Sequence, residues 1–264
     1  MSSQRPRSIT LDDGETIAYH HTPGKSPGVV FLTGLKSDMT GGKALALESF
    51  CKARGQAYLR FDYFGHGKSS GDFIDGRIGR WAADAVFVID RLIEGPVVLV
   101  GSSMGGWIML LAALARKNRV SGLLGVAPAP DFTVDLMERT FTGDQKRELA
   151  ETGMVVVPNC HEDSDGYEIG AAFLEEARNH LLLRAPIDLA CPIRLVHGMK
   201  DEDVPWNTSL EIQKRLASRD VEVTLIKSGG HRLSTEVDLD RLARILDRLL
   251  SQLEARNQGC GDHI

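Results

Sequence analysis

Apolar and polar positions along the chain alternate between two patterns. Short runs of apolar, largely β-branched residues are typical of buried strands, and they recur along the sequence. Longer stretches that mix apolar and polar residues, a pattern typical of helices packed on a core, separate these runs. The expected strands are 29–32, 57–61, 97–100, 120–126, 193–198 and 221–226, and the expected helices are 43–54, 77–93 and 103–116. This order predicts a mostly parallel sheet with helices on both faces.

The two ends of the chain differ from this pattern. Residues 8–11 and 16–19 flank a polar Asp-Asp-Gly-Glu segment, which predicts an antiparallel hairpin at the start of the sheet. Residues 256–264 are polar and contain glycine, so we expect them to form a disordered tail. No repeat or linker divides the sequence. Residues 1–264 are therefore expected to form a single domain.

One internal segment interrupts the alternation of strands and helices. Residues 131–185 are biased towards helix, but glycines and a proline break them up. Because this segment stands between two expected strands, we predict an inserted helical cap over the strand ends. It contains twelve Asp and Glu against five Lys and Arg, a formal charge of −7. This charge indicates a solvated face, or else a cap that disfavours polyanionic substrates such as coenzyme A thioesters.

Composition limits the possible partners. The 36 Asp and Glu exceed the 31 Lys and Arg, and the net charge of −5 argues against nucleic acid or an anionic membrane surface. No apolar stretch reaches the length of a membrane span. The histidines show no metal-ligand spacing, so we expect neither a metal nor a cofactor. The oligomeric state is not predicted.

Cysteine usage and the N-terminus bear on location. Cys51, Cys160, Cys191 and Cys260 are scattered without Cys-x-x-Cys spacing, which indicates reduced thiols. Residues 1–7 are polar and basic and lack the apolar run of a signal peptide. We therefore expect a cytoplasmic protein. The alternative is the mitochondrial matrix, if a presequence is missing from this chain.

The clearest chemical signal is the segment 101–105, Gly-Ser-Ser-Met-Gly. It matches the pattern G-x-S-x-G, follows the apolar run 97–100 and opens the expected helix 103–116. Strand, tight turn and helix in this order describe a nucleophile elbow, in which small residues let the backbone double back. The central Ser103 would then stand at a helix N-terminus, where unpaired N–H groups stabilise negative charge.

A serine nucleophile requires a base, and the base requires an acid that orients it. Asp201 follows the expected strand 193–198, and His231 lies in a glycine-rich loop after the strand 221–226. Both therefore follow carboxyl ends of strands, where an open α/β sheet binds its ligands. Ser103, Asp201 and His231 are candidates for nucleophile, acid and base.

Other residues compete for two of these roles. Asp203 stands two residues after Asp201 in the same turn, and Asp131 follows another expected strand. His197 is an alternative base, but its place before a glycine at a strand end favours packing beneath the acid turn. His66, in a glycine-rich turn, could line the pocket.

The chain resembles the alpha/beta hydrolases from Ser8 to about Leu250. It is most similar to the subgroup of mitochondrial acyl-protein thioesterases that also hydrolyse the acyl glucuronide of mycophenolic acid. The similarity lies in Lys-Ser-Pro-Gly at 25–28, Lys-Ala-Leu-Ala at 43–46, Arg-Phe-Asp-Tyr at 60–63, the segment 101–107, and Cys-Pro-Ile-Arg-Leu at 191–195 continuing to His-Gly-Met-Lys-Asp at 197–201. The resemblance implies an α/β-hydrolase fold with a mostly parallel eight-stranded sheet and an inserted helical cap. It also implies Ser103 as nucleophile, Asp201 as acid and His231 as base.

The oxyanion hole is expected from main-chain geometry. It requires the N–H of the residue after the nucleophile and an N–H from the loop after the third strand, here Met104 and Leu35. The loop reads Thr-Gly-Leu at 33–35, where the superfamily often has His-Gly. Because the donors belong to the backbone, this departure leaves the hole intact.

These observations predict a serine hydrolase that cleaves carboxylic esters or thioesters through an acyl-enzyme. The resemblance implies an acyl-protein thioesterase or an acyl-glucuronide esterase, with an ester, a thioester or an acylated protein as substrate. The alternatives are a small-molecule carboxylesterase or lactonase, and a non-catalytic binding protein on the same fold. Apolar cap residues such as Leu136, Phe141 and Val155 could cover an acyl chain or form the cap's own core.

Overall fold

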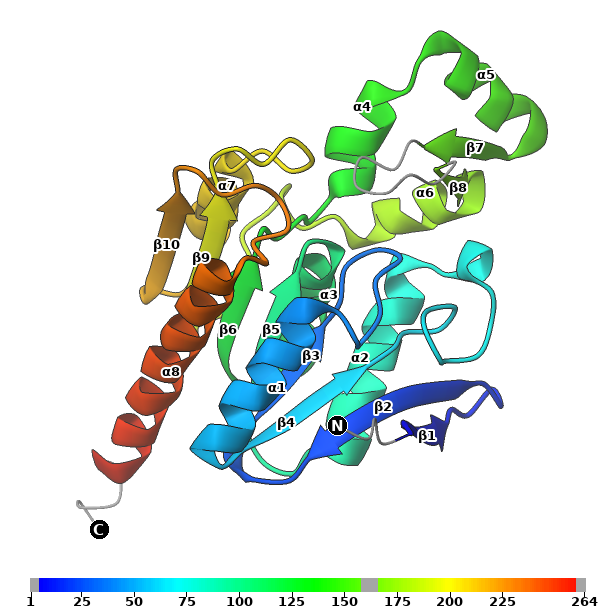
Figure 1. The fold of residues 1–264 in the computed structure, drawn as a ribbon. Coiled ribbons are helices and arrows are strands. Elements are labelled where there is room, and N and C mark those ends of the chain that lie inside the picture. The colour runs from blue at the N-terminus through cyan, green and yellow to red at the C-terminus, as the bar shows by residue number, and fades with distance from the viewer. Residues whose placement is uncertain (1–4, 158–165, 260–264) are drawn as a thin grey trace.

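A sheet of eight strands organises the fold, which a computed structural model describes for residues 5–157 and 166–259 (Figure 1). The strand order across the sheet is β1-β2-β4-β3-β5-β6-β9-β10. From β4 to β10 neighbouring strands pair in parallel, whereas β2 is antiparallel to β1 and β4. The strands are β1 (Arg7–Thr10), β2 (Thr16–Thr22), β3 (Lys25–Leu32), β4 (Gln56–Phe61), β5 (Val97–Ser102), β6 (Val120–Val126), β9 (Ile193–Gly198) and β10 (Val221–Ile226). The predicted mostly parallel, eight-stranded sheet is confirmed.

Helices cover both faces of this sheet, as predicted. They are α1 (Gly42–Arg54), α2 (Ile78–Leu92), α3 (Met104–Ala115), α7 (Asn207–Arg215) and α8 (Glu236–Gly259). Successive side chains of a strand point to opposite faces. In β3, Val30 and Leu32 therefore pack with α2 and α3, while Val29 and Phe31 pack with α1 and α8 (Figure 1). Two apolar cores result, one on each side of the sheet.

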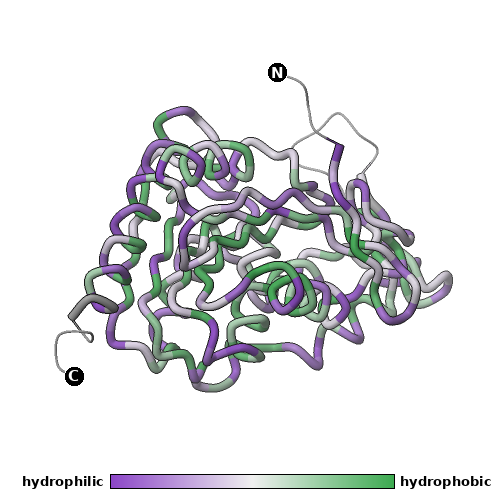
Figure 2. Tube along the Cα trace, turned by 90° about the horizontal axis from the view of Figure 1, so that it is seen from below, coloured by the Kyte–Doolittle hydropathy of each residue, from purple (hydrophilic) through white to green (hydrophobic). Residues whose placement is uncertain are grey.

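Helix α8 is the last element of the chain and extends into the region expected to be a disordered tail. Apolar residues at a spacing of three or four positions, ending with Leu249 and Leu253, are buried against the sheet, so hydrophobic and hydrophilic segments alternate along the helix (Figure 2). Arg256 extends this anchoring by donating to Asp220 at 2.9 Å. Residues 256–259, expected in a disordered tail, therefore continue the helix, and residues 260–264 lie outside the described residues.

The segment between β6 and β9 stands apart from the sheet in Figure 1. It holds η2 (Thr133–Met137), α4 (Glu138–Thr140), α5 (Gly143–Thr152), β7 (Met154–Val157), β8 (Tyr167–Gly170), α6 (Ala171–Ala177) and η3 (Arg178–His180). We refer to residues 131–185 as the insertion. The antiparallel pair β7 and β8 gives it a small sheet beside the expected helices. Because the insertion follows β6, it begins at the carboxyl edge of the large sheet.

The two ends of the insertion are tied together by Asp131. Its side chain has no exposed surface, and its two oxygens accept the N–H groups of Leu182 and Leu183, each at 2.8 Å. Burial raises the pKa of Asp131, and these two hydrogen bonds oppose the rise. Asp131, a candidate acid in the sequence, therefore serves here as a clamp between segments about fifty residues apart.

Aromatic side chains join the insertion to the body of the protein. Trp107 of α3 donates its indole N–H to the carbonyl of His180 at 3.0 Å and meets the ring of Phe132 edge-on, with centroids 5.7 Å apart. Phe173 lies against Phe132 and against Trp81 of α2. Such pairs add specific geometry to the burial of large apolar surfaces. The insertion is thus packed on α2 and α3.

Three apolar residues of the insertion, which could cover an acyl chain or form its core, are buried or partly buried. Val155 has no exposed surface, Phe141 is 7% exposed, and Leu136 packs partly buried against the same core. Their burial favours the second interpretation, packing within the insertion.

The helices of residues 5–157 and 166–259 include none with both the length and the hydropathy of a membrane span.

Two of the four cysteines can be described. Cys51 and Cys191 are free thiols, and burial raises the pKa of Cys51 to about 12 and that of Cys191 to about 11. Both are therefore protonated and unreactive at neutral pH. Cys160 and Cys260 lie outside the described residues.

We predict that Asp131→Ala lowers the free energy of unfolding by about 3 kcal/mol, because it leaves two N–H groups without their acceptor. Urea denaturation measures this effect. Asp135→Ala is the matched control, because it removes a more exposed carboxylate that pairs with Arg184 and should cost less than about 1 kcal/mol. Equal losses in the two variants would contradict the role of Asp131 as a clamp.

Candidate active site

Ser103 stands at a sharp turn between β5 and α3. Its φ of 55° and ψ of −123° are unusual for a residue with a side chain. Main-chain hydrogen bonds hold this conformation: Ser103 N–H donates to the carbonyl of Val126 at 3.0 Å, and Ser103 carbonyl accepts from Gly106 at 2.8 Å and Ala129 at 3.0 Å. The turn has the strand, loop and helix expected of a nucleophile elbow.

The two glycines of the motif are required by the close approach of main chains. A Cβ on Gly101 would lie 2.3 Å from the carbonyl oxygen of Gly105, and one on Gly105 would lie 2.1 Å from the carbonyl oxygen of Leu32. Both distances are far below van der Waals contact. The first turn of α3 therefore packs directly on the end of β3, which explains the G-x-S-x-G pattern physically.

His231 connects Ser103 to Asp201. Its Nε2 lies 3.0 Å from Ser103 Oγ, and its Nδ1 lies 2.8 Å from Asp201 Oδ2. The carboxylate is an acceptor, so the neutral ring carries its proton on Nδ1 and leaves Nε2 free to accept the serine hydroxyl. Ser103, Asp201 and His231 follow β5, β9 and β10 in that order. The carboxyl ends of these parallel strands lie along the same edge of the sheet. The structure thus brings together the three residues that the sequence singled out.

The carboxylate of Asp201 is buried and fully hydrogen-bonded. Oδ1 accepts the N–H groups of Asp203 at 3.0 Å and Val204 at 2.8 Å, and Oδ2 accepts from both His231 and His197. Burial alone would raise the pKa of Asp201, but the hydrogen bonds from the two histidines outweigh it and hold this pKa well below its usual range. Asp201 is therefore ionised throughout the pH range in which a histidine ordinarily titrates.

His197 contacts the same carboxylate oxygen of Asp201 that His231 contacts. It has no exposed surface, and its Nε2 lies 3.1 Å from Asp201 Oδ2 and 3.0 Å from the carbonyl of Val204. Both neighbours are acceptors, so Nε2 carries the proton and Nδ1, 2.8 Å from Ser209 Oγ, accepts the hydroxyl. Sequence reasoning placed His197 beneath the acid turn but missed its bond to Asp201.

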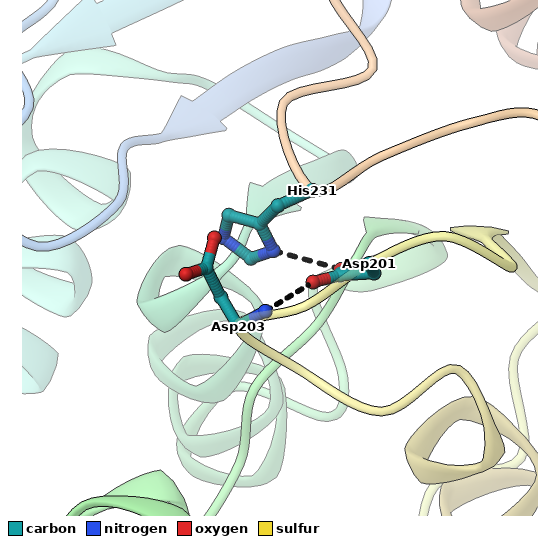
Figure 3. Close-up of side chains that lie close together, drawn as sticks. All are labelled: Asp201, Asp203 and His231. Atoms are coloured by element: carbon teal, nitrogen blue, oxygen red, sulfur yellow. Dashed lines mark hydrogen bonds and ion pairs between the residues drawn. The ribbon is translucent and has the colours of Figure 1, made fainter. Parts of the chain in front are cut away.

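Asp203, the nearest rival acid, also lies beside His231. Figure 3 shows its carboxylate next to the imidazole ring, and the polar atoms of Asp201, Asp203 and His231 lie within 4.8 Å of one another. Such a group of side chains could in principle hold a cation. Here, however, Nδ1 of His231 and both oxygens of Asp201 already have hydrogen-bond partners within the protein. The arrangement fits an oriented base better than a metal site.

The segments that carry the two expected oxyanion donors, Met104 and Leu35, both lie close to Ser103. Met104 is the first residue of α3, so its N–H lacks an acceptor within the helix. The loop after β3 approaches from the other side, because a Cβ on Gly34 would lie 3.4 Å from Ser103 Cβ. Leu35 follows directly in this loop. Main chain from two segments therefore approaches the serine, and the oxyanion hole remains a proposal.

Comparison with known proteins gives a consistent picture. Residues 29–245 match the model of the alpha/beta hydrolase family. The human protein named palmitoyl-protein thioesterase ABHD10, mitochondrial, is 43% identical over 93% of this chain and 80% of its own length. The mouse structure of alpha/beta hydrolase domain-containing protein 10 superposes with a TM-score of 0.88 at 39% identity, over 95% of this chain and 100% of that one. A putative hydrolase from Agrobacterium vitis gives a TM-score of 0.88 at 37% identity, over 92% and 98%.

The expectation of a cytoplasmic location is wrong. The human and mouse relatives, 43% and 42% identical to this chain, are named as mitochondrial proteins. Scattered thiols and the lack of a signal-peptide apolar run led to the expectation. Free thiols indicate a reducing compartment but do not separate one reducing compartment from another.

Fold and local geometry agree with these comparisons. The matched region contains the whole elbow, the turn after β9 and the loop after β10. The hydrolase relatives cover most of the chain, and the resemblance seen in the sequence is confirmed. The chain belongs to the alpha/beta hydrolase family, in its subgroup of ABHD10-like proteins.

Proposed function

We propose that the protein is a serine thioesterase that removes acyl groups from proteins through an acyl-enzyme. The observation that carries this proposal is the bridge from Ser103 through His231 to Asp201, with distances of 3.0 and 2.8 Å. The substrate class is supported by the relatives, which are named palmitoyl-protein thioesterases. A non-catalytic binding protein would have no need for an ordered base beside a strained serine.

In the proposed reaction, His231 Nε2 takes the proton of Ser103 as Oγ attacks the carbonyl carbon of the thioester. The oxyanion of the tetrahedral intermediate accepts hydrogen bonds from the N–H groups of Leu35 and Met104. When the carbon–sulfur bond breaks, the proton on Nε2 passes to the leaving thiolate. Water then enters, gives a proton to His231 Nε2 and attacks the carbonyl carbon of the acyl-enzyme. When the bond from this carbon to Ser103 Oγ breaks, the proton on Nε2 passes to Oγ, which releases the carboxylic acid and restores Ser103 and His231.

Asp201 supports both halves of this cycle. Its low pKa keeps the carboxylate ionised, so a negative charge faces Nδ1 whenever the imidazole becomes positive. The same contact fixes the ring orientation and the tautomer. Because Asp201 Oδ1 is held by two main-chain N–H groups, the carboxylate cannot rotate away when the proton moves.

A small-molecule carboxylesterase or lactonase would use the same residues, as would an acyl-glucuronide esterase. These activities differ from the proposed one in the leaving group and in the size of the substrate. The net charge of −7 on the insertion bears on this choice. Two of its basic residues are engaged in ion pairs within the insertion, Arg184 with Asp135 and Arg178 with Glu138, each at 2.6 Å.

We expect Ser103→Ala to abolish labelling by a fluorophosphonate probe, because the probe reacts only with an activated serine. Ser102→Ala is the matched control, since Ser102 is the neighbouring serine but belongs to strand β5. It should retain labelling. Gel fluorescence after a short incubation measures both. Persistent labelling of Ser103→Ala would refute the assignment of the nucleophile.

We expect Asp201→Asn to lower kcat/KM by about a thousandfold or more, because the amide no longer holds the reactive tautomer of His231. Asp203→Asn should change it less than about tenfold, since Asp203 binds Asp201 through its main-chain N–H. Steady-state kinetics with an acyl thioester measures both variants. A larger loss in Asp203→Asn would transfer the role of the acid to Asp203.

We predict that the same medium-length acyl group is cleaved faster from a neutral thiol such as N-acetylcysteamine than from coenzyme A. The insertion carries a formal charge of −7 and would repel the coenzyme's phosphates, so high salt should narrow the gap. Values of kcat/KM on both thioesters at low and high ionic strength decide this. A preference for coenzyme A would instead assign leaving-group selection to basic side chains beside the triad, such as Lys200 and Arg232.

A further inference from the structure

The loop after β3 carries one of the two proposed oxyanion donors without the support of a helix or strand. It comprises residues 33–37, and we call it the oxyanion loop. Lys36, next to Leu35, has a φ of 54°, a left-handed conformation that costs a residue with a side chain about 1 kcal/mol. A loop strained in this way keeps its shape only if contacts from other segments hold it.

His66 supplies such a contact from the turn after β4. Its Nε2 lies 3.2 Å from the main-chain nitrogen of Lys36, and its Nδ1 lies 3.1 Å from the carbonyl oxygen of Phe64. These partners define the state of the ring. The N–H of Lys36 can only donate and the carbonyl of Phe64 can only accept, so Nε2 is unprotonated and Nδ1 carries the proton.

The surroundings of His66 favour the neutral ring. It is 4% exposed and meets the rings of Tyr63, Phe73 and Trp81 edge-on, with centroids 5.7, 5.3 and 5.0 Å away. Burial lowers its pKa, and the nearby positive charge of Lys36 lowers it further, whereas the hydrogen bond to Phe64 opposes this. A protonated ring would also turn an N–H towards the N–H of Lys36.

We propose that His66 is a positioning residue for the oxyanion hole: in its neutral Nδ1–H tautomer it holds the N–H of Lys36 and thereby aims the N–H of Leu35 at the carbonyl oxygen of the substrate. The held peptide joins Leu35 to Lys36, so fixing it restricts the backbone rotation that sets the direction of the Leu35 N–H. The inference rests on the proposed serine chemistry. It adds a role for a residue that touches neither Ser103 nor the substrate.

Two near-isosteric substitutions separate the two hydrogen bonds of His66. The amide of glutamine extends to the position of Nε2, whereas that of asparagine reaches only to the position of Nδ1. His66→Gln therefore keeps an acceptor for Lys36, and His66→Asn keeps only the bond to Phe64. Both variants replace the imidazole ring with a carboxamide and differ in its reach, which makes the pair a matched test.

The experiment compares these variants with the wild type in thioester turnover and in binding of a trifluoromethyl ketone bearing the same acyl chain. This ketone forms a tetrahedral adduct with serine, whose oxyanion occupies the hole. We expect His66→Asn to lower kcat/KM by about thirtyfold, with KM changed less than about twofold, and to weaken ketone binding by the same factor. His66→Gln should stay within about threefold of the wild type. His21→Phe, a change on strand β2 away from the site, should leave all values unchanged.

Equal losses in His66→Asn and His66→Gln would overturn the proposal, as would unchanged ketone binding in His66→Asn. If both variants unfold, ¹⁵N NMR of the wild-type ring decides: a proton on Nδ1 supports the proposal, and a proton on Nε2 refutes it. Failure of the proposed function gives a different result, because the wild type would then neither turn over thioester nor react with fluorophosphonate.

Discussion

The close packing of main chains beneath Ser103 is the constraint on which the site depends. Because Gly101 and Gly105 have no side chains, the first turn of α3 rests on the end of β3, and the serine is forced into a left-handed conformation. The same contact brings the loop after β3 within reach of the serine. One steric requirement therefore sets the position of the nucleophile and of both main-chain segments around it.

Histidines with defined hydrogen-bond partners recur around this turn. His231 is oriented by Asp201, His197 by the same carboxylate and the carbonyl of Val204, and His66 by the main chain at Lys36 and Phe64. In each ring, a fixed donor or acceptor decides which nitrogen carries the proton. The side chain of His231 is 15% exposed, whereas that of His197 has no exposed surface. Burial thus separates the proposed proton carrier from the supporting rings.

The insertion is held on the body by interactions of a different kind. Asp131 ties the two ends of the insertion together by accepting two main-chain N–H groups. Trp107 joins the insertion to α3 by a hydrogen bond and a ring contact. The aromatic series continues through Phe173 to Trp81, which also packs on His66. The insertion and the turn that contains His66 therefore share one packed aromatic cluster.

The sequence by itself determined the features that depend on neighbours in the chain. The pattern of apolar positions predicted the strands of the large sheet and helices α1, α2 and α3, but not α7 or α8. The glycines at 101 and 105 predicted the elbow, because it follows from local geometry. The order of Ser103, Asp201 and His231 at strand ends predicted the candidate site. Only the tertiary structure decided that Asp131 is a clamp, that His197 binds the acid and that His66 holds Lys36. The contacts of Asp131 and His66 join residues 51 and 30 positions apart, which the order of strands in the sheet brings together and which leave no periodic signal in the chain. His197 and Asp201 are only four residues apart, but the conformation of the turn after β9 decides whether their side chains meet.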